Sequence, residues 1–193
     1  MKIILASKSG VRKEILDKYS VENEVIVSNV DEDQVKDSLI AENATPLIIS
    51  KNLAELKSTT VSTKTPNRLV LGADSVISLN NKLINKPKSR NEALSILKKL
   101  NDSKHYLISS VCISKNGSMI WNYSDQSELK MKNLNEKELI DYLKKIKTDT
   151  LLKYGVYQIE AEGEALFYYI EGDSFSIMGL PIKQILKYIK DST

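Results

Sequence analysis

Leu69–Ile84 reads LVLGADSVISLNNKLI, and this stretch decides the fold class. Its first three residues are apolar and predict a buried strand that ends at Gly72-Ala73-Asp74. Further along, two apolar pairs flank Asn80-Asn81, which is typical of a tight hairpin turn. A buried strand followed by a hairpin indicates a sheet that contains antiparallel pairs.

Predicted strands and helices alternate on both sides of this stretch. The strands are Ile3–Ala6, Val25–Val27, His105–Ser114, a return strand through Trp121, and Ala165–Ile170. The helices begin at Ser9-Gly10, Thr45-Pro46, Ser89, Asn135 and Pro181. This order predicts an α/β fold with a mixed central sheet, flanking helices and an antiparallel hairpin extension. The glycine-rich fingerprints of dinucleotide and P-loop sites are absent.

Composition sets limits on the class of protein. With 193 residues, 41% hydrophobic and 27% charged, the chain fits one globular domain spanning residues 1–193. A net charge of +3 suits a phosphate-bearing ligand but falls short of the basic surface of a nucleic-acid-binding protein. Aromatic residues make up only 6%, which also argues against stacking on nucleic acid.

The cysteine and histidine content narrows the chemistry further. Cys112 is the only cysteine and has apolar neighbours, so we expect an inert core thiol. His105 is the only histidine, and no Cys/His cluster exists for zinc. The first residues do not resemble a signal peptide, and no apolar run is long enough for a membrane span. We therefore expect a cytoplasmic protein that does not associate with membranes.

A first candidate site is the turn Ser7–Arg12, which links a strand to a helix. Backbone N–H groups and hydroxyls at a helix N-terminus favour an anion, and Arg12 adds a fixed charge. The alternative is a helix cap followed by a surface arginine.

Carboxylates and lysines supply further candidates. Asp74 follows an apolar strand, where it can hold a divalent ion or take a proton from water; the alternative is an ordinary turn aspartate. Asp31-Glu32-Asp33 reads either as a metal-binding cluster or as an acidic helix start. Lys57 and Lys86 are weak candidates alone, because lysines are abundant.

Taken together and in order, eight segments resemble the Maf family of nucleotide pyrophosphatases. LASKSGVRKEIL at Leu5–Leu16 is similar to L-A-S-x-S-P-R-R-x-E-L-L, although Gly10-Val11 stands where that family has Pro-Arg. The other segments are Asp31-Glu32, Leu53–Ser58, Gly72–Val76, Lys86–Leu97, His105–Val111, Ile170–Asp173 and Gly179–Pro181.

The resemblance implies an ITPase-like Maf fold and hydrolysis of a nucleoside triphosphate to the monophosphate and pyrophosphate. It implies that Asp74, Lys57, Lys86 and Arg12 are catalytic and that Ser7 and Ser9 bind substrate. It also implies Mg²⁺ or Mn²⁺ on Glu32 and Asp74, and a homodimer.

Glu160 stands where many family members have the glutamine of G-x-Y-x-I-Q-G. By resemblance, glutamine at this position is associated with members that act on thymidine or uridine nucleotides. Members of the 7-methyl-GTP type carry glutamate there. A carboxylate accepts two hydrogen bonds, which matches the N1–H and N2–H₂ donors of guanine. We therefore expect Glu160 to face the base and the substrate to be 7-methyl-GTP or a broad set of nucleotides.

Two other functions stay open from the sequence. One is a dTTP/UTP-type pyrophosphatase. The other is a non-catalytic nucleotide-binding regulator of cell division. It stays open because Val11 stands where the family has an arginine, and the loss of that charge would weaken catalysis.

Overall fold

The computed structural model describes residues 2–192, in which one mixed sheet organises the fold. The strand order is β2-β1-β3-β5-β6-β7, and β4 pairs with β3. Parallel pairs join β1 to β2 and to β3, and all other pairs are antiparallel. The strands are β1 (Ile3–Leu5), β2 (Asn23–Val25), β3 (Val70–Leu79), β4 (Lys82–Ile84), β5 (Lys104–Lys115), β6 (Ser118–Met131) and β7 (Phe167–Glu171). The predicted mixed α/β fold is confirmed.

Helices flank the sheet on both sides. They are α1 (Gly10–Lys18), α2 (Glu32–Ala41), α3 (Pro46–Ser62), α4 (Arg90–Leu100), α5 (Glu136–Lys144), α6 (Thr148–Tyr154), α7 (Ser174–Ile177) and α8 (Ile182–Asp191). A short 3₁₀ helix covers Glu162–Leu166. Within residues 2–192, no helix combines the length and apolar character that crossing a membrane requires.

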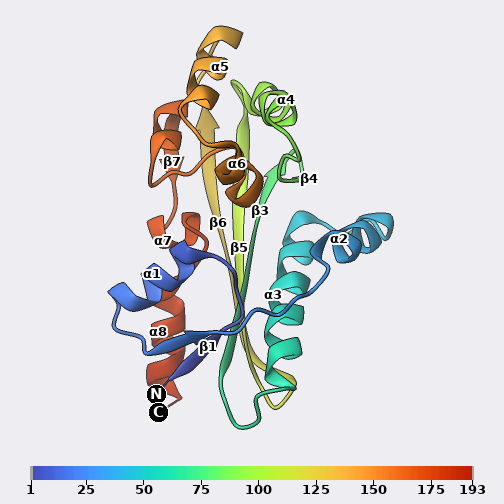
Figure 1. Cartoon of the computed structure of the whole chain (residues 1–193), viewed down its shortest axis with the longest axis vertical. Coiled ribbons are helices and arrows are strands. Elements are labelled where there is room, and N and C mark those ends of the chain that lie inside the picture. The colour runs from blue at the N-terminus through green and yellow to red at the C-terminus, as the bar shows by residue number, and fades with distance from the viewer. Residues whose placement is uncertain (1, 193) are drawn as a thin grey trace.

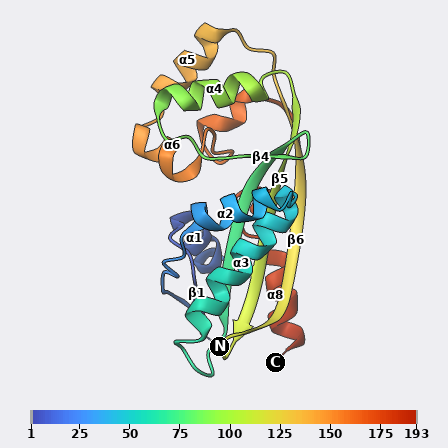
Figure 2. The ribbon, with the colours of Figure 1, turned by 90° about the vertical axis from the view of Figure 1, so that its right-hand side faces the viewer.

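Two lobes are built on the long strands β3, β5 and β6. Figure 1 shows α1, α8 and α3 around the lower half of these strands, and α4, α5 and α6 around the upper half. Figure 2 shows the two groups of helices one above the other on the same long strands. Each lobe has its own hydrophobic cluster, one centred on Leu97, Leu129 and Leu143, the other on Leu5, Leu16 and Ile185.

Local signals set the helix starts. The Thr45 hydroxyl accepts a hydrogen bond from the Ile48 N–H, and Pro46 begins α3. Asn135 and Glu138 form a reciprocal capping box at α5. Both starts were predicted from these residue types, because caps act within a single turn of helix.

The largest difference from the predicted strands concerns the end of β3. The sequence predicts that the strand from Leu69 ends at Gly72-Ala73-Asp74, but β3 continues to Leu79 and Asp74 lies within it. The antiparallel partner β5 pairs with these residues through Val111 and Ser110, so the ladder does not stop. Only the parallel partner β1 ends here, at Leu5 opposite Leu71.

Smaller differences concern the connections. β2 begins at Asn23 and ends at Val25, whereas the predicted strand begins at Val25. The predicted strand from Ala165 begins at Phe167, because Glu162–Leu166 forms the 3₁₀ helix. Helix α2 begins where Asp31-Glu32-Asp33 reads as an acidic helix start, whereas the helices α6 and α7 were not predicted. Cys112 is buried in β5, as expected, and burial raises the pKa of its thiol.

Candidate active site

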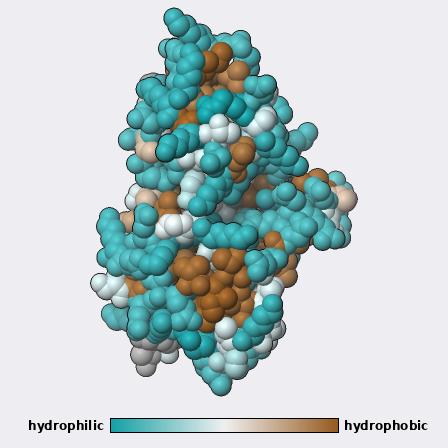
Figure 3. Space-filling view, viewed as in Figure 1, coloured by the Kyte–Doolittle hydropathy of each residue, from teal (hydrophilic) through white to brown (hydrophobic). Residues whose placement is uncertain are grey.

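A cleft between the two lobes brings the predicted site residues together. Its walls include the end of β1, the middle of β3, the first turn of α2 and the segment after α6. Hydrophilic side chains border the gap between the lobes in Figure 3. All the predicted site residues line it: Ser7, Ser9, Arg12, Glu32, Lys57, Asp74, Lys86 and Glu160.

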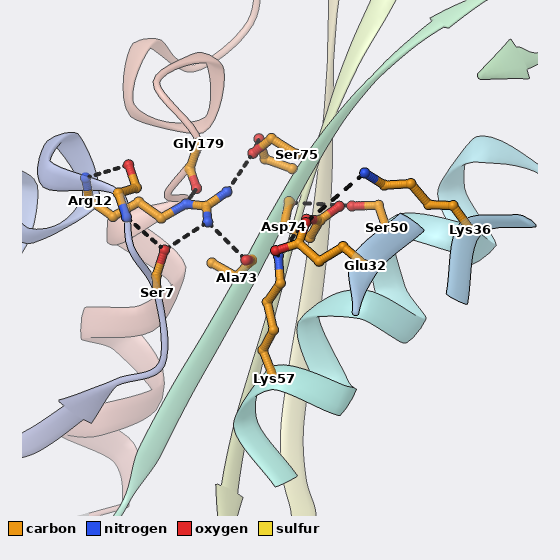
Figure 4. A network of polar contacts seen from close by, with 12 residues as sticks. Ser7, Arg12, Glu32, Lys36, Ser50, Lys57, Ala73, Asp74, Ser75 and Gly179 are labelled. Carbon is orange, nitrogen blue, oxygen red and sulfur yellow. Dashed lines mark hydrogen bonds and ion pairs between the residues drawn. The ribbon is translucent and has the colours of Figure 1, made fainter. Parts of the chain in front are cut away.

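The lower wall centres on Asp74. Side chains alternate along a strand, so Gly72 and Asp74 face the same side of β3, where α3 lies. Lys57 of α3 places its Nζ 2.8 Å from Asp74 Oδ1 and 2.9 Å from Glu32 Oε1. The side chains of Lys57 and Asp74 are each only 7% exposed. One ammonium group therefore neutralises two carboxylates from different elements (Figure 4).

The electrostatics keep Glu32 ionised. Partial burial opposes its charge, but Lys57 outweighs burial, with help from Lys36 and Lys86, so the pKa of Glu32 lies below its ordinary value. Among the described residues, Asp74 Oδ2 is buried and has no hydrogen-bond partner. A buried carboxylate oxygen without a partner needs one, so this atom is prepared to accept a proton donor or a cation.

A divalent cation fits these residues only with help from the substrate. No group of three or more His, Cys, Asp or Glu side chains within residues 2–192 is placed to hold a metal ion. Mg²⁺ is commonly bound by one or two carboxylates together with substrate phosphates and waters. The unpartnered Asp74 Oδ2 and the half-exposed Glu32 are two such carboxylates.

Arg12 is held by the protein itself. It donates to the Gly179 carbonyl (2.9 Å), the Ala73 carbonyl (2.8 Å), Ser7 Oγ (3.1 Å) and Ser75 Oγ (3.0 Å). These bonds join the turn after β1, the strand β3 and the turn before α8 (Figure 4). Arg12 thus fixes the shape of the Ser7–Arg12 turn and places a buried positive charge behind it.

The two serines have local partners. Ser7 Oγ accepts a hydrogen bond from the Ser9 N–H, and Ser9 caps α1 by accepting from the Arg12 N–H. The turn is therefore both a helix cap and part of the cleft wall, so the two readings of its sequence are compatible.

The upper wall contributes Lys86 and Glu160. Lys86 follows β4, and its Nζ donates to the Lys153 carbonyl at 2.9 Å. Desolvation within the cleft and then the charge of Arg12 lower the pKa of Lys86. Glu160 is exposed, in the turn that follows α6. These two residues lie across the cleft from the Asp74 cluster.

Sequence reasoning missed three cations of the cleft. Six cationic side chains line it against three carboxylates, an excess of three positive charges. The additional cations are Lys8, Lys36 and Lys153. Lys36 follows Glu32 by four residues, a spacing that places both on one face of the helix once the acidic start at Asp31-Glu32-Asp33 is continued.

His105 contacts a residue of the upper wall from within the core. It is fully buried, and its Nε2 lies 2.9 Å from the hydroxyl of Tyr157, which lines the cleft. Tyr142 holds the same segment by donating to the Val156 carbonyl at 3.1 Å. The segment that carries Glu160 is therefore anchored to β5 and α5.

The buried His105 makes stability depend on pH. Burial lowers its pKa to about 4, whereas a histidine in an unfolded chain titrates near ~6.5. The unfolded chain therefore binds a proton first, so stability falls as pH drops from about 6.5 to about 4, by up to roughly 3 kcal/mol. Denaturant unfolding across this range should show a smaller pH slope for His105→Gln than for wild type. Leu16→Ala, a core control in the other lobe, should keep the wild-type slope; equal slopes for all three would contradict the assignment.

Comparisons with known proteins identify the family of this chain. Residues 2–192 match the family described as Maf-like protein. The chain belongs to the Maf-like family. A nucleoside triphosphate pyrophosphatase of Pelagibacter ubique (strain HTCC1062) is 60% identical over 188 residues, 97% of this chain and 96% of that protein. The family resemblance is confirmed.

Two further comparisons are more distant. A 7-methyl-GTP pyrophosphatase of Rhizobium etli is 33% identical to this Maf-like chain over 190 residues, 98% of this chain and 96% of that protein. Among solved structures, a HAM1 protein from Coxiella burnetii aligns with a TM-score of 0.46 and 16% identity, covering 69% of this chain and 74% of that one.

Proposed function

We propose that this Maf-like protein is a nucleoside triphosphate pyrophosphatase that acts as one domain and releases a nucleoside monophosphate and pyrophosphate. The observation that carries the proposal is the unpartnered Asp74 Oδ2 beside Lys57 and Glu32, in a cleft with excess positive charge. Two relatives that are named nucleoside triphosphate pyrophosphatase and 7-methyl-GTP pyrophosphatase support the same reaction class.

In the proposed mechanism, water attacks the phosphorus of the α-phosphate and Asp74 Oδ2 takes its proton. The bond from that phosphorus to the oxygen bridging the α- and β-phosphates breaks, and pyrophosphate leaves. Lys57 and Lys86 neutralise the phosphate oxygens, and Arg12 adds charge behind the turn while holding Ser7 and Ser9 in place. Mg²⁺ or Mn²⁺, when held by Glu32 and Asp74, supplies Lewis-acid charge that stabilises the leaving group.

A nucleotide panel tests this function directly. Each triphosphate is incubated with the protein and Mg²⁺ or Mn²⁺, and pyrophosphate is converted to phosphate and measured. Release of pyrophosphate with matching monophosphate supports the proposal. Nucleotide binding without turnover under every metal condition would instead favour the non-catalytic regulator of cell division.

For the base, we propose that Glu160 favours 7-methyl-GTP or a broad set of nucleotides over dTTP and UTP. Glu160→Gln replaces a double acceptor with a donor and an acceptor, which suits a pyrimidine edge. We expect the ratio of kcat/KM for UTP over 7-methyl-GTP to rise by about tenfold or more, because a mismatched polar contact costs at least ~1.4 kcal/mol. Glu164→Gln, at an exposed position outside the cleft, is the control. An unchanged ranking of bases would remove Glu160 from base recognition.

We also propose a cytoplasmic homodimer, as the family resemblance implies. The edge strand β2 supports assembly, because Val25 at its end and Ile26 directly after it are exposed. The single, buried Cys112 supports a reducing compartment. Analytical ultracentrifugation tests the dimer, and a monomer at every concentration would contradict it.

A further inference from the structure

Lys36 is a largely buried cation that the mechanism above does not use. It projects from α2 into the cleft wall, and its side chain is 15% exposed. Its Nζ lies 4.0 Å from Glu32 Oε2 and 3.8 Å from Asp33 Oδ1. Both distances exceed hydrogen-bond range, so these pairs are weak ion pairs only. Within residues 2–192, the ammonium group has no hydrogen-bond acceptor.

The neighbouring cations are bound more fully. Lys57 contacts two carboxylate oxygens within 2.9 Å. Arg12 makes four side-chain hydrogen bonds, and Lys86 donates to a backbone carbonyl. Lys36 therefore brings three N–H donors to the cleft without an acceptor. Its stem is mostly buried, but Nζ is not among the fully buried atoms without a partner, so its donors face the solvent of the cleft, where a ligand oxygen can replace water.

The position of Lys36 points to the ligand. Figure 4 shows its side chain reaching from α2 toward Glu32 and Asp74, while Arg12 approaches Asp74 from the opposite side. An anion that reaches across Asp74 would thus meet positive charge on both sides. A polyphosphate chain has this extended form and carries oxygens along its length.

We infer that Lys36 is a further substrate-binding residue, which donates to an oxygen of the triphosphate on the α2 side of Asp74. This inference rests on the proposed function, because it names a ligand for the same cleft. The competing role is structural: at i,i+4 from Glu32, an ion pair on a helix contributes only about 0.3–0.5 kcal/mol. A structural role would affect stability and leave phosphate affinity unchanged.

The test compares Lys36→Met, Lys36→Arg and Lys51→Met. Lys51 is an exposed lysine on α3 that does not line the cleft, so its substitution removes the same charge elsewhere. Three quantities are measured for each: KM and kcat for the preferred nucleotide, inhibition by inorganic pyrophosphate, and affinity for inorganic tripolyphosphate by calorimetry.

For Lys36→Met we expect KM and the pyrophosphate inhibition constant to rise by about tenfold, the effect of losing one charge-assisted hydrogen bond. Tripolyphosphate affinity should fall by a similar factor, whereas kcat should change less. Lys36→Arg should recover part of the loss, since it keeps the charge. Lys51→Met should behave as wild type.

Two results would overturn the inference. The first is unchanged inhibition and tripolyphosphate affinity in Lys36→Met, whether or not its stability falls. The second is an equal loss in Lys51→Met, which would indicate general charge attraction. If the wild type hydrolyses no nucleotide, the proposed function fails, yet calorimetry with tripolyphosphate still decides whether Lys36 binds a phosphate chain.

Discussion

Asp74→Asn should lower kcat by about 10²-fold or more, the size typical of losing a positioned general base. The amide keeps the shape of the side chain and can still accept a hydrogen bond from Lys57, which lies 2.8 Å from Oδ1. It cannot take a proton from water at Oδ2. Lys57 also keeps its contact with Glu32 at 2.9 Å, so its charge is not left unpaired. We therefore expect the variant to fold.

Steady-state kinetics and denaturant unfolding separate the two effects. The matched control is Asp37→Asn, which removes the same charge from an exposed position on α2 outside the cleft. That control should keep wild-type turnover and stability. Near-normal turnover of Asp74→Asn would remove Asp74 from the chemistry and would leave the cation-rich cleft as a binding site only.

Most helix starts of this fold can be predicted from the sequence, because the capping residues act within one turn of helix. Thr45-Pro46 and the pair Asn135 and Glu138 fix helix starts through contacts within one turn. Only the acidic start of α2 at Asp31-Glu32-Asp33 was indicated, because the helix buries no residue completely and its sequence carries only a weak apolar pattern.

The path of β3 was not readable locally. Gly72-Ala73-Asp74 has the composition of a turn, and only its pairing with β5 keeps it extended. Asp74 nevertheless lies beside the turn that follows β1, because β1 stops at Leu5 opposite Leu71. The cleft thus lies at the end of β1, whereas Asp74 lies within β3 and not at its end.

The site shows the same division between local and long-range information. The resemblance to a family gathered distant residues into one cluster, and the cleft contains all of them. The contacts of these residues are visible only in the structure. It shows that Lys57 lies between two carboxylates, that Arg12 donates to groups of the protein itself, and that Lys36 lacks an acceptor among the described residues. Each of these depends on which element lies opposite, and spacing along the chain does not contain that information.

Gly72→Ala should have the largest effect on stability, because the backbone of α3 leaves no room for a Cβ at this residue. A Cβ added there would lie 2.1 Å from the Ala54 carbonyl oxygen and 2.7 Å from the Ser58 N–H nitrogen. Both are backbone atoms of α3, so no side chain can rotate away. We expect a loss of at least about 3 kcal/mol, the upper end of the usual overpacking range. For a chain of this size, that corresponds to a fall in Tm of roughly 6–12 °C.

The same substitution should also reduce turnover, since α3 carries Lys57 and Asp74 follows Gly72 by two residues on the same face of β3. If α3 moves outward, the 2.8 Å contact between Lys57 and Asp74 lengthens and the buried carboxylate loses its nearest cation. Gly10→Ala is the stability control, because its added Cβ would meet only Glu14 Oε1, at 4.0 Å. A Gly72→Ala protein as stable as Gly10→Ala would show that α3 can withdraw from β3 freely, and the placement of Lys57 would then need another cause.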